Sequence, residues 1–453
     1  MTARGSAQQR AQDKTTRMTE LATLTVKKVM WRLLPFLMAC YFVAFLDRVN
    51  VGFAHLQMSK SLGLSEAAFG FGAGIFFIGY FLLEVPSNIL LERLGARVWI
   101  ARIMLSWGLV STAFGFIPQI SHYTGLRPDL CFYLLRFLLG LCEAGFYPGV
   151  VFYLTRWFPS AYRARMIAFF MLAVPVSSVV GAPLSGLLLN VTGLGLEGWQ
   201  WMYILEGLPS ILMSLAVWFY LTEHPRNANW LKRDEAEWLQ ATIHREQALP
   251  GLGAHSGFLK VIYDIRILMC AFANFSMQGA TYSITLFLPA LITQLGYSNA
   301  QTGLILAFPP FIGAIGMVLL SRHSDRTGER KFHVAAALLM LAVGIAGGAL
   351  LRDQVSRLLF FTLANVGSVS LGPMLYPIPA SFLSRGTAAA GIAVVSSLGA
   401  LGGFFGPYLF GYMKTQTGGP TTSLLLMASL ALAGALVAAS LPVRKTATEV
   451  AGL

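Results

Sequence analysis

The chain has 453 residues, of which 56% are hydrophobic and only 12% charged, and its mean hydropathy is +0.64. A soluble fold of this size could not cover so much apolar surface, and disordered or collagen-like chains have fewer apolar residues or a different repeat. The net charge of +13 does not indicate a nucleic-acid partner, because the basic residues lie in short segments between apolar stretches. The composition therefore predicts a polytopic membrane protein in a lipid bilayer.

Apolar stretches long enough for a helical crossing, which takes about 20 residues, recur along the chain. β-barrel strands would be shorter and would alternate apolar with polar residues, which these stretches do not. The sequence therefore predicts an all-α membrane protein with twelve transmembrane helices. They are expected near residues 31–53, 67–90, 98–118, 130–154, 165–189, 200–221, 266–292, 301–320, 333–351, 357–379, 388–411 and 421–442.

The basic residues are distributed unevenly between the connections. They are frequent before the first crossing and after the second, fourth, sixth and eighth, for example at Arg93, Arg163 and Arg233, whereas the intervening connections carry few. Because basic loops stay in the cytoplasm, this alternation predicts that both termini are cytoplasmic. We expect a multi-pass protein of the inner (plasma) membrane.

The longest polar interruption falls between the sixth and seventh crossings and divides the chain into two sets of six. The interruption is rich in charged residues and compatible with a helix. The expected organisation is a cytoplasmic N-terminal tail at 1–30, a six-helix bundle at 31–221, a cytoplasmic linker at 222–265, a second six-helix bundle at 266–442 and a cytoplasmic tail at 443–453.

Two short patterns recur six crossings apart. Residues 92–97 and 325–330 both read acid-Arg-x-Gly followed by a base, and the Gly- and Pro-containing segment 181–186 is echoed at 406–411. An even number of crossings between copies predicts parallel repeats around an axis normal to the membrane. The chance occurrence of Gly and Pro in membrane helices would explain either repeated pattern alone. It poorly explains two patterns that both recur at the same offset of six crossings.

These motifs identify a family resemblance: the chain resembles the major facilitator superfamily and, within it, the anion:cation symporter family of tartrate, phthalate, nicotinate and hydroxyphenylacetate type permeases. The loop pattern at 92–97 resembles the signature motif of the superfamily. The narrower resemblance rests on residues 45–50, 79–88, 136–145, 198–201 and 206–209. It covers essentially all of residues 30–445. It implies a secondary active transporter that moves a small organic carboxylate together with protons by alternating access.

Four charged residues lie well inside the predicted crossings: Asp47, Arg48, Arg136 and Glu143. An ionised side chain near the bilayer centre costs roughly 2.5–3.5 kcal/mol, so such residues are usually paired and functional. The resemblance implies that the first and fourth helices pack together. We expect Arg48 and Arg136 to bind the carboxylate and Asp47 and Glu143 to carry protons. A static salt-bridge network that locks the helices is the alternative.

Five further polar residues are expected in the substrate site. Tyr80 matches a family position that contacts substrate, although it could equally be a packing ring. Gln278 and Tyr282 belong to a polar stripe on the seventh crossing, for which a hydrogen-bonded helix seam is the alternative. Tyr376 and Ser396 lie where the tenth and eleventh crossings depart from the family pattern. The wall there is poorer in amides, which favours a small acid, an aromatic monocarboxylate or a dicarboxylate, over a highly hydroxylated substrate.

The acid-Arg-Gly loops supply the residues that we expect to act in gating: Glu92, Arg93, Arg97, Asp325 and Arg326. Loops on one side of the membrane must release and re-form ion pairs when the two halves rock. If these residues served only to orient the chain by the positive-inside rule, the arginines would be explained. The acid at a fixed position near Gly in both loops would not be explained.

Other classes of protein fit the sequence poorly. The seven histidines include no pair at metal-binding spacing on one helix, and no nucleophile elbow or phosphate-binding loop is present, so neither an enzyme nor a cofactor is predicted. The expected partners are the organic anion, protons and the bilayer, with no nucleic acid, and the protein is expected to be a monomer. The alternative function is a drug or sugar carrier of the same fold working as an antiporter or uniporter.

Overall fold

The computed structural model describes residues 2–247, 261–383 and 385–442. The regular elements of these residues are helices, apart from an isolated bridge between Gly193 and Leu196. The prediction of an all-α protein is confirmed. The expected C-terminal tail at 443–453 and residues 248–260 of the expected linker lie outside the described residues.

The N-terminal half begins with one long helix. The expected tail at 1–30 is helical from Thr2 and continuous with the first crossing, since it is rich in good helix formers such as Ala, Gln, Arg and Lys. Gly145 breaks the fourth crossing with a φ of 92°, a conformation that only glycine adopts without strain. The helices are α1 (Thr2–Ser61), α2 (Glu66–Leu94), α3 (Ala96–Phe114), α4 (Ile117–Thr124), α5 (Pro128–Glu143), α6 (Phe146–Trp157), α7 (Ser160–Met171), α8 (Ala173–Leu188) and α9 (Gly198–Tyr220).

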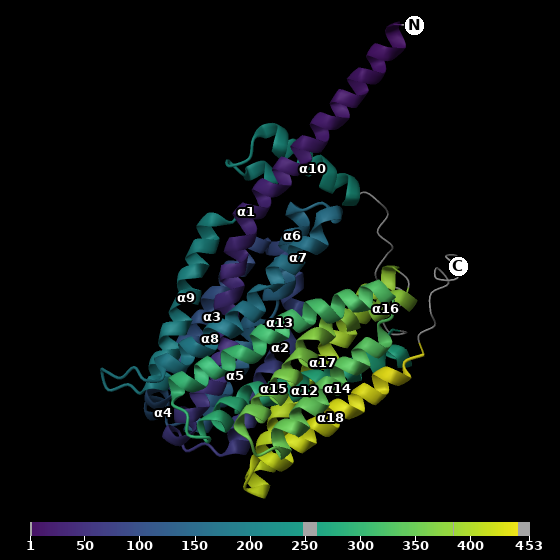
Figure 1. The fold of residues 1–453 in the computed structure, drawn as a ribbon. Helices are drawn as coiled ribbons and strands as arrows, with labels where there is room; N and C mark the ends of the chain where they lie inside the picture. Colours follow the sequence, from purple (N-terminus) through teal and green to yellow (C-terminus); the bar gives the residue numbers. More distant parts are fainter. Residues whose placement is uncertain (1, 248–260, 384, 443–453) are drawn as a thin grey trace.

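The C-terminal half lies beside the N-terminal half, as Figure 1 shows in green to yellow beside purple to teal. A short helix, η1 (Pro225–Asn227), and the polar helix α10 (Arg233–Gln247) follow α9. The tenth crossing is broken before Pro377, which starts a short separate helix. The helices of this half are α12 (Ile265–Thr293), α13 (Asn299–Thr327), α14 (Lys331–Leu350), α15 (Gln354–Leu375), α16 (Pro377–Phe382), α17 (Arg385–Thr417) and α18 (Pro420–Ser440).

The number of helical spans agrees with the sequence. Among the described residues, 11 helical segments are long and apolar enough to cross a membrane, and the number is 12 when α3 and α4, bent by 81° at their junction, count as one span. Helices suit this environment because all their backbone groups are hydrogen-bonded within the segment.

The linker helix α10 is tied to α1 by one ion pair. Lys28 Nζ lies 2.8 Å from Glu235 Oε2, which also accepts a 2.8 Å hydrogen bond from the backbone N–H of Lys232. Burial acts to raise the pKa of the Glu235 carboxyl, but these two donors outweigh it and hold the pKa below its usual range. In Figure 1, α10 and the start of α1 project together from one end of the molecule.

The two halves pack against each other along three helix pairs: α2 with α17, α8 with α13, and α1 with α12. The first two pairs occupy equivalent positions in the repeat. α2 and α13 are the second crossings of their halves, α8 and α17 are the fifth, and each pair joins the second crossing of one half to the fifth of the other. Gly70 approaches the carbonyl of Pro407, and Gly303 approaches that of Ala182, so closely that a side chain would collide with the backbone. Small residues permit such close packing of membrane helices.

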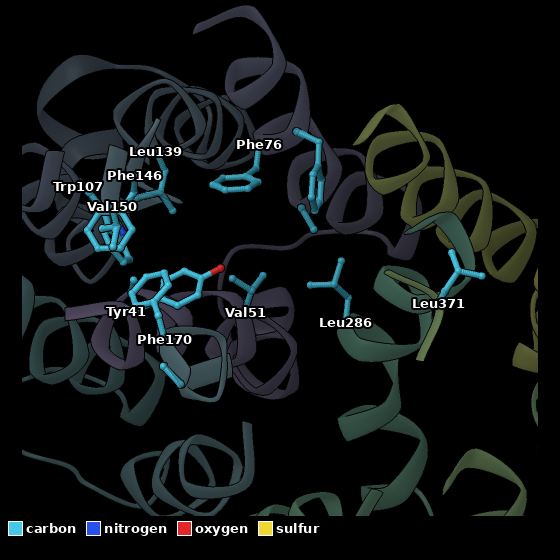
Figure 2. Packing of buried hydrophobic residues seen from close by; sticks show 14 of the residues in the cluster. Tyr41, Val51, Phe76, Trp107, Leu139, Phe146, Val150, Phe170, Leu286 and Leu371 are labelled. Atoms are coloured by element: carbon cyan, nitrogen blue, oxygen red, sulfur yellow. The ribbon is translucent and has the colours of Figure 1, made fainter. Parts of the chain in front are cut away.

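An aromatic cluster lies beside the interface within the N-terminal half (Figure 2). The ring centroid of Tyr41 lies 4.7 Å from that of Phe170 and 5.8 Å from that of Phe146, in stacked orientations. Trp107 is fully buried and packs edge-on against Phe146. These rings fill the space around the segment of α1 that carries the intramembrane charges.

Close packing within the C-terminal half can be tested at Gly344 of α14. A Cβ atom there would collide with the backbone of Phe360 and Ala364 on α15. We expect Gly344→Ala to lower the thermal unfolding midpoint in detergent, since overpacking costs about 1–3 kcal/mol. The matched control is Gly372→Ala on α15, where a Cβ atom meets only the Tyr376 ring at 3.7 Å. An unchanged midpoint for Gly344→Ala would contradict the close approach of α14 and α15.

Candidate functional site

A narrow cavity between the two halves contains the charged residues predicted from the sequence. Its wall combines residues of α1, α2 and α5 with residues of α12, so both halves contribute. The lining residues are Asp47, Arg48, Phe76, Phe77, Arg136, Leu139, Glu143, Tyr282 and Leu286.

Arg48 and Glu143 form the central ion pair of this cavity. Arg48 Nε donates to Glu143 Oε1 at 3.0 Å, and Arg48 Nη2 contacts the same oxygen. Arg48 Nη1 donates to the hydroxyl of Tyr282 at 3.3 Å and so connects α1 with α12 of the other half. The side chain of Glu143 is only 5% exposed, whereas that of Arg48 is 20% exposed. One guanidinium therefore bridges an acid of its own half and a hydroxyl of the opposite half.

Arg136 lines the same cavity but makes no ion pair among the described residues. Its Nη2 donates to the backbone carbonyl of Ala73 at 2.9 Å, and its guanidinium carbon lies 5.0 Å from the centroid of the Phe76 ring. Its Nε is buried without a hydrogen-bond partner. Glu143, which lies about two turns further along on the same face of the helix, is engaged by Arg48. Arg136 is thus a buried cation whose hydrogen-bonding capacity is only partly used.

Asp47, unlike Glu143, lies among neutral hydrogen-bond donors. Its Oδ1 accepts hydrogen bonds from Ser111 Oγ at 2.7 Å and from Asn50 Nδ2 at 3.0 Å, and no arginine pairs with it among the described residues. The reason is helical geometry, because adjacent residues diverge by about 100° around the axis, so Asp47 turns toward α3 while Arg48 turns toward α5.

Tyr80 lies next to the ion pair. Its ring centroid is 5.8 Å from the guanidinium carbon of Arg48 and 6.1 Å from the ring of Phe76. The side chain is half-buried. Arg48 is therefore flanked by aromatic rings on which a planar cation is favourably placed.

Three of the predicted C-terminal residues do not line the cavity that holds the four charges. Tyr376 and Ser396 lie within hydrogen-bonding reach of each other, and Asn274 Nδ2 donates to the Tyr376 hydroxyl at 3.5 Å and to the Val395 carbonyl at 3.0 Å. Gln278 is half-buried, and no hydrogen bond of its side chain is found within the described part of the chain. The structure thus brings Tyr282 to the charges and places Tyr376 and Ser396 in a separate polar cluster.

The predicted gating residues of the N-terminal half make few contacts. Arg97 lies over the ring of Trp218 at 5.3 Å, whereas Glu92 and Arg93 are exposed and have no ion-pair partner in the described residues. In the C-terminal half, Asp325 lies 3.4 Å from Arg330, and Arg326 is exposed.

Glu223, which the sequence pattern does not single out, contacts the N-terminal gating loop instead. It accepts hydrogen bonds from the backbone N–H groups of Ala96 and Arg97 at 3.0 and 2.9 Å and pairs with Arg156. A carboxylate at a helix N-terminus satisfies free N–H groups and interacts favourably with the helix dipole. The available signal was its position, an acid two residues after the end of the sixth predicted crossing.

One ion pair joins the two halves within the described residues, at the end of the molecule where α2 begins. Lys414 Nζ of α17 lies 2.8 Å from Glu66 Oε1 of α2, and His55 Nε2 lies 3.0 Å from Glu66 Oε2. The backbone N–H of Ala67 also donates to Thr415 Oγ1 at 3.2 Å. Lys414 and His55 are both buried. These contacts hold the two halves together at this end.

Comparison with known proteins agrees with this architecture. Residues 37–407 and 270–451 match the model of the Major Facilitator Superfamily, so the chain belongs to this superfamily. The protein is accordingly a multi-pass membrane transporter and not an enzyme.

Named relatives extend over nearly the whole chain. A protein of Agrobacterium vitis named "Putative tartrate transporter" is 45% identical over 434 residues, which cover 96% of this chain and 98% of the relative. A protein of Acinetobacter baumannii named "Quinolone resistance transporter" is 36% identical and covers 91% of this chain and 93% of its own length. The solved structure of a D-xylose-proton symporter has the same fold, with a TM-score of 0.70 at 16% identity over 91% of this chain and 97% of that chain.

Proposed function

We propose that the protein is a secondary active transporter that moves a small organic carboxylate together with protons across the inner membrane. The observation that carries this proposal is the Arg48 guanidinium, which is held between the carboxylate of Glu143 and the hydroxyl of Tyr282 in a cavity between the halves. A guanidinium in this position can exchange an internal carboxylate for one that belongs to the substrate.

The exchange of partners couples the anion to a proton. While Glu143 is ionised, it occupies Arg48 and the arginine is unavailable to substrate. A proton on Glu143 removes the charge that holds Arg48, and a substrate carboxylate then takes its place. Loss of the proton on the other side of the membrane restores the internal pair and expels the anion. Arg136, which has no internal ion-pair partner among the described residues, provides a second positive charge in the same cavity.

The substrate class follows from the cations and from the relatives. The two cavity-lining arginines, Arg48 and Arg136, favour an anion over a neutral sugar. The relative from Agrobacterium vitis described above is named for tartrate, an organic carboxylate. The half-buried Tyr80 and Tyr282 provide hydroxyl groups and ring faces, which suit a small or planar acid. Tyr376, Ser396 and Gln278 are proposed to contact substrate when the C-terminal half closes on it.

Alternating access requires one end of the molecule to be closed at a time. We assign the end with Glu66 and Lys414 to the periplasmic side, because the positive-inside rule places both termini in the cytoplasm. The residues of the acid-Arg-Gly loops then lie on the cytoplasmic side, where they are proposed to form the gate that closes when the periplasmic contacts break.

The alternative is a drug carrier of the same fold that works as an antiporter or a uniporter. The specific observation that favours it is the relative named for quinolone resistance. The test is uptake of a panel of radiolabelled compounds into proteoliposomes with an imposed pH gradient. The proposed function predicts accumulation of small mono- or dicarboxylates that a protonophore abolishes. Accumulation of neutral sugars, or proton-driven exchange of drugs without carboxylate uptake, would support the alternative.

The driving force gives a quantitative prediction. A monocarboxylate that enters with two protons carries one net positive charge inward, so an inside-negative potential contributes about 2.3 kcal/mol per charge per 100 mV. We expect the initial rate of monoanion uptake to rise when a potassium diffusion potential is imposed on proteoliposomes without a pH gradient. The control is the same measurement in liposomes without protein. A rate that does not depend on the potential would indicate a single proton and an electroneutral cycle.

A further inference from the structure

A groove on the surface lies apart from the central cavity, near the start of the first crossing. Its volume is about 730 Å³, and its walls are formed by residues 24–32 of α1, by Tyr220 at the end of α9 and by residues 232–235 at the start of α10. In Figure 1, α10 lies beside α1 at the end of the molecule from which α1 projects. The orientation proposed above puts this end on the cytoplasmic side. In that orientation the groove lies at the level of the lipid headgroups of the cytoplasmic leaflet.

Basic side chains outnumber acids in this groove. Four basic residues and one acid line it, and the acid, Glu235, pairs with Lys28 at 2.8 Å. The other three, Lys27, Arg32 and Lys232, form no ion pair with any described side chain, and the two lysines are exposed. Three positive charges therefore face the groove without an acid to neutralise them, and they attract an anion.

Arg32 is held in place although it has no acidic partner among the described residues. Its guanidinium carbon lies 4.5 Å from the centroid of the Tyr220 ring and 5.2 Å from that of the Trp230 ring. The Tyr220 hydroxyl donates to the backbone carbonyl of Arg32 at 3.0 Å, which fixes the ring beside it. No hydrogen bond of the Arg32 side chain is found in the described part of the chain, and its Nε is buried without an acceptor. An oriented guanidinium with unused donors suits the oxygens of a phosphate.

Apolar side chains on the same groove distinguish a lipid from a soluble anion. Leu24 and Trp31 line it together with the basic residues, and they are 63% and 66% exposed. Tryptophan at the start of a crossing is typical of the interface between membrane and water. A soluble anion would cover the basic wall and leave Leu24 and Trp31 in water. A phospholipid covers both walls, because its phosphate meets the cations and its glycerol and acyl groups meet the apolar side chains.

We propose that this groove binds the headgroup of an anionic phospholipid of the cytoplasmic leaflet. The phosphate binds Arg32, Lys27 and Lys232, as in other basic pockets between membrane helices on the cytoplasmic side. Because the walls belong to α1, α9 and α10, the bound lipid fastens the linker helix to the N-terminal half, in addition to the Lys28–Glu235 ion pair. The inference does not depend on which compound the protein transports.

Thermal unfolding of the purified full chain in detergent micelles, titrated with dioleoyl phosphatidylglycerol, tests the site. We expect the lipid to raise the unfolding midpoint of the wild type. Lys27→Gln/Lys232→Gln, which replaces two exposed residues, should need a roughly tenfold higher lipid concentration for half of the effect, since each cation near an anionic headgroup contributes about fivefold. The matched control is Lys60→Gln/Arg352→Gln, which removes two exposed cations from connections predicted to be periplasmic and should respond as the wild type does. A wild-type response of Lys27→Gln/Lys232→Gln, or an equal loss in the control, would overturn the proposal.

Parallel titrations separate a lipid from a soluble phosphate. Dioleoyl phosphatidylcholine has the same acyl chains without a net charge, and glycerol 3-phosphate and inorganic phosphate have the charge without acyl chains. We expect each of these to raise the midpoint far less than phosphatidylglycerol does. Trp31→Ala should weaken the response to phosphatidylglycerol and leave that to glycerol 3-phosphate unchanged, because only the lipid reaches the apolar wall. An equal shift with glycerol 3-phosphate would show a site for soluble anions, and an equal shift with phosphatidylcholine would show that the cations do not select the lipid; either result would overturn the proposal.

Discussion

Replacement of Arg48 by lysine is expected to abolish high-affinity uptake of the carboxylate. The guanidinium uses Nε and Nη2 on Glu143 and Nη1 on Tyr282, so it serves two partners at once in a planar geometry. A lysine ammonium is a point charge on a flexible stem and cannot reproduce this fork. Losing two hydrogen bonds to a charged group, each worth about 1.5–3 kcal/mol, corresponds to at least a roughly 100-fold lower uptake rate at low substrate concentration.

The measurement is initial uptake of labelled substrate in proteoliposomes at concentrations below the wild-type KM. The matched control is Arg102→Lys on α3, since Arg102 stacks over Trp99 at 4.1 Å and has no ion-pair partner in the described residues. This control should transport normally. Near-normal uptake by Arg48→Lys would remove Arg48 from the binding site and leave Arg136 as the cation that binds the anion.

Replacement of Glu143 by glutamine is expected to separate substrate exchange from accumulation. Glutamine is neutral and so resembles protonated Glu143, which leaves Arg48 free for the substrate carboxylate. Exchange of labelled for unlabelled substrate should survive, because it requires no net proton movement. Accumulation driven by a pH gradient should be lost, because one proton-binding group is absent from the cycle.

Both activities are measured on the same proteoliposomes, first by counterflow without a gradient and then by uptake with an imposed pH gradient. Glu237→Gln on α10, which removes an exposed acid that pairs with Arg233, serves as the control and should retain both activities. Accumulation at the wild-type level in Glu143→Gln would show that Glu143 carries no obligatory proton and forms a structural pair with Arg48. Asp47→Asn should also lose accumulation, and more severely if the Asn50 contact is disrupted.

The structure explains why Asp47 and Glu143 are expected to behave differently although both are buried acids in crossings. Glu143 has a cation within contact distance, whereas Asp47 accepts hydrogen bonds from the neutral side chains of Ser111 and Asn50. Substitution of Glu143 therefore frees an arginine, and substitution of Asp47 alters a hydrogen-bonded network of neutral groups. A comparison of the two variants measures these two effects separately.

The sequence by itself determined the helical membrane fold, the division into two halves and the location of the charged residues. These properties are local, since the length of an apolar run decides whether a helix can cross the bilayer and the break between the sixth and seventh crossings separates the halves. The loop motif at 92–97 and the charges of the first and fourth crossings were sufficient to indicate the superfamily and the candidate site.

Only the tertiary structure decided which charges meet. Glu143 pairs with Arg48 of another helix and not with Arg136 of its own, Glu206 has no cationic partner among the described residues, and Glu66 pairs with Lys414 across 348 positions of sequence. The physical reason is that periodicity places a side chain on a face of its own helix, whereas the rotation and packing of the neighbouring helix decide what that face contacts. In a low-dielectric interior these contacts determine whether an acid holds a proton, occupies an arginine or joins the two halves.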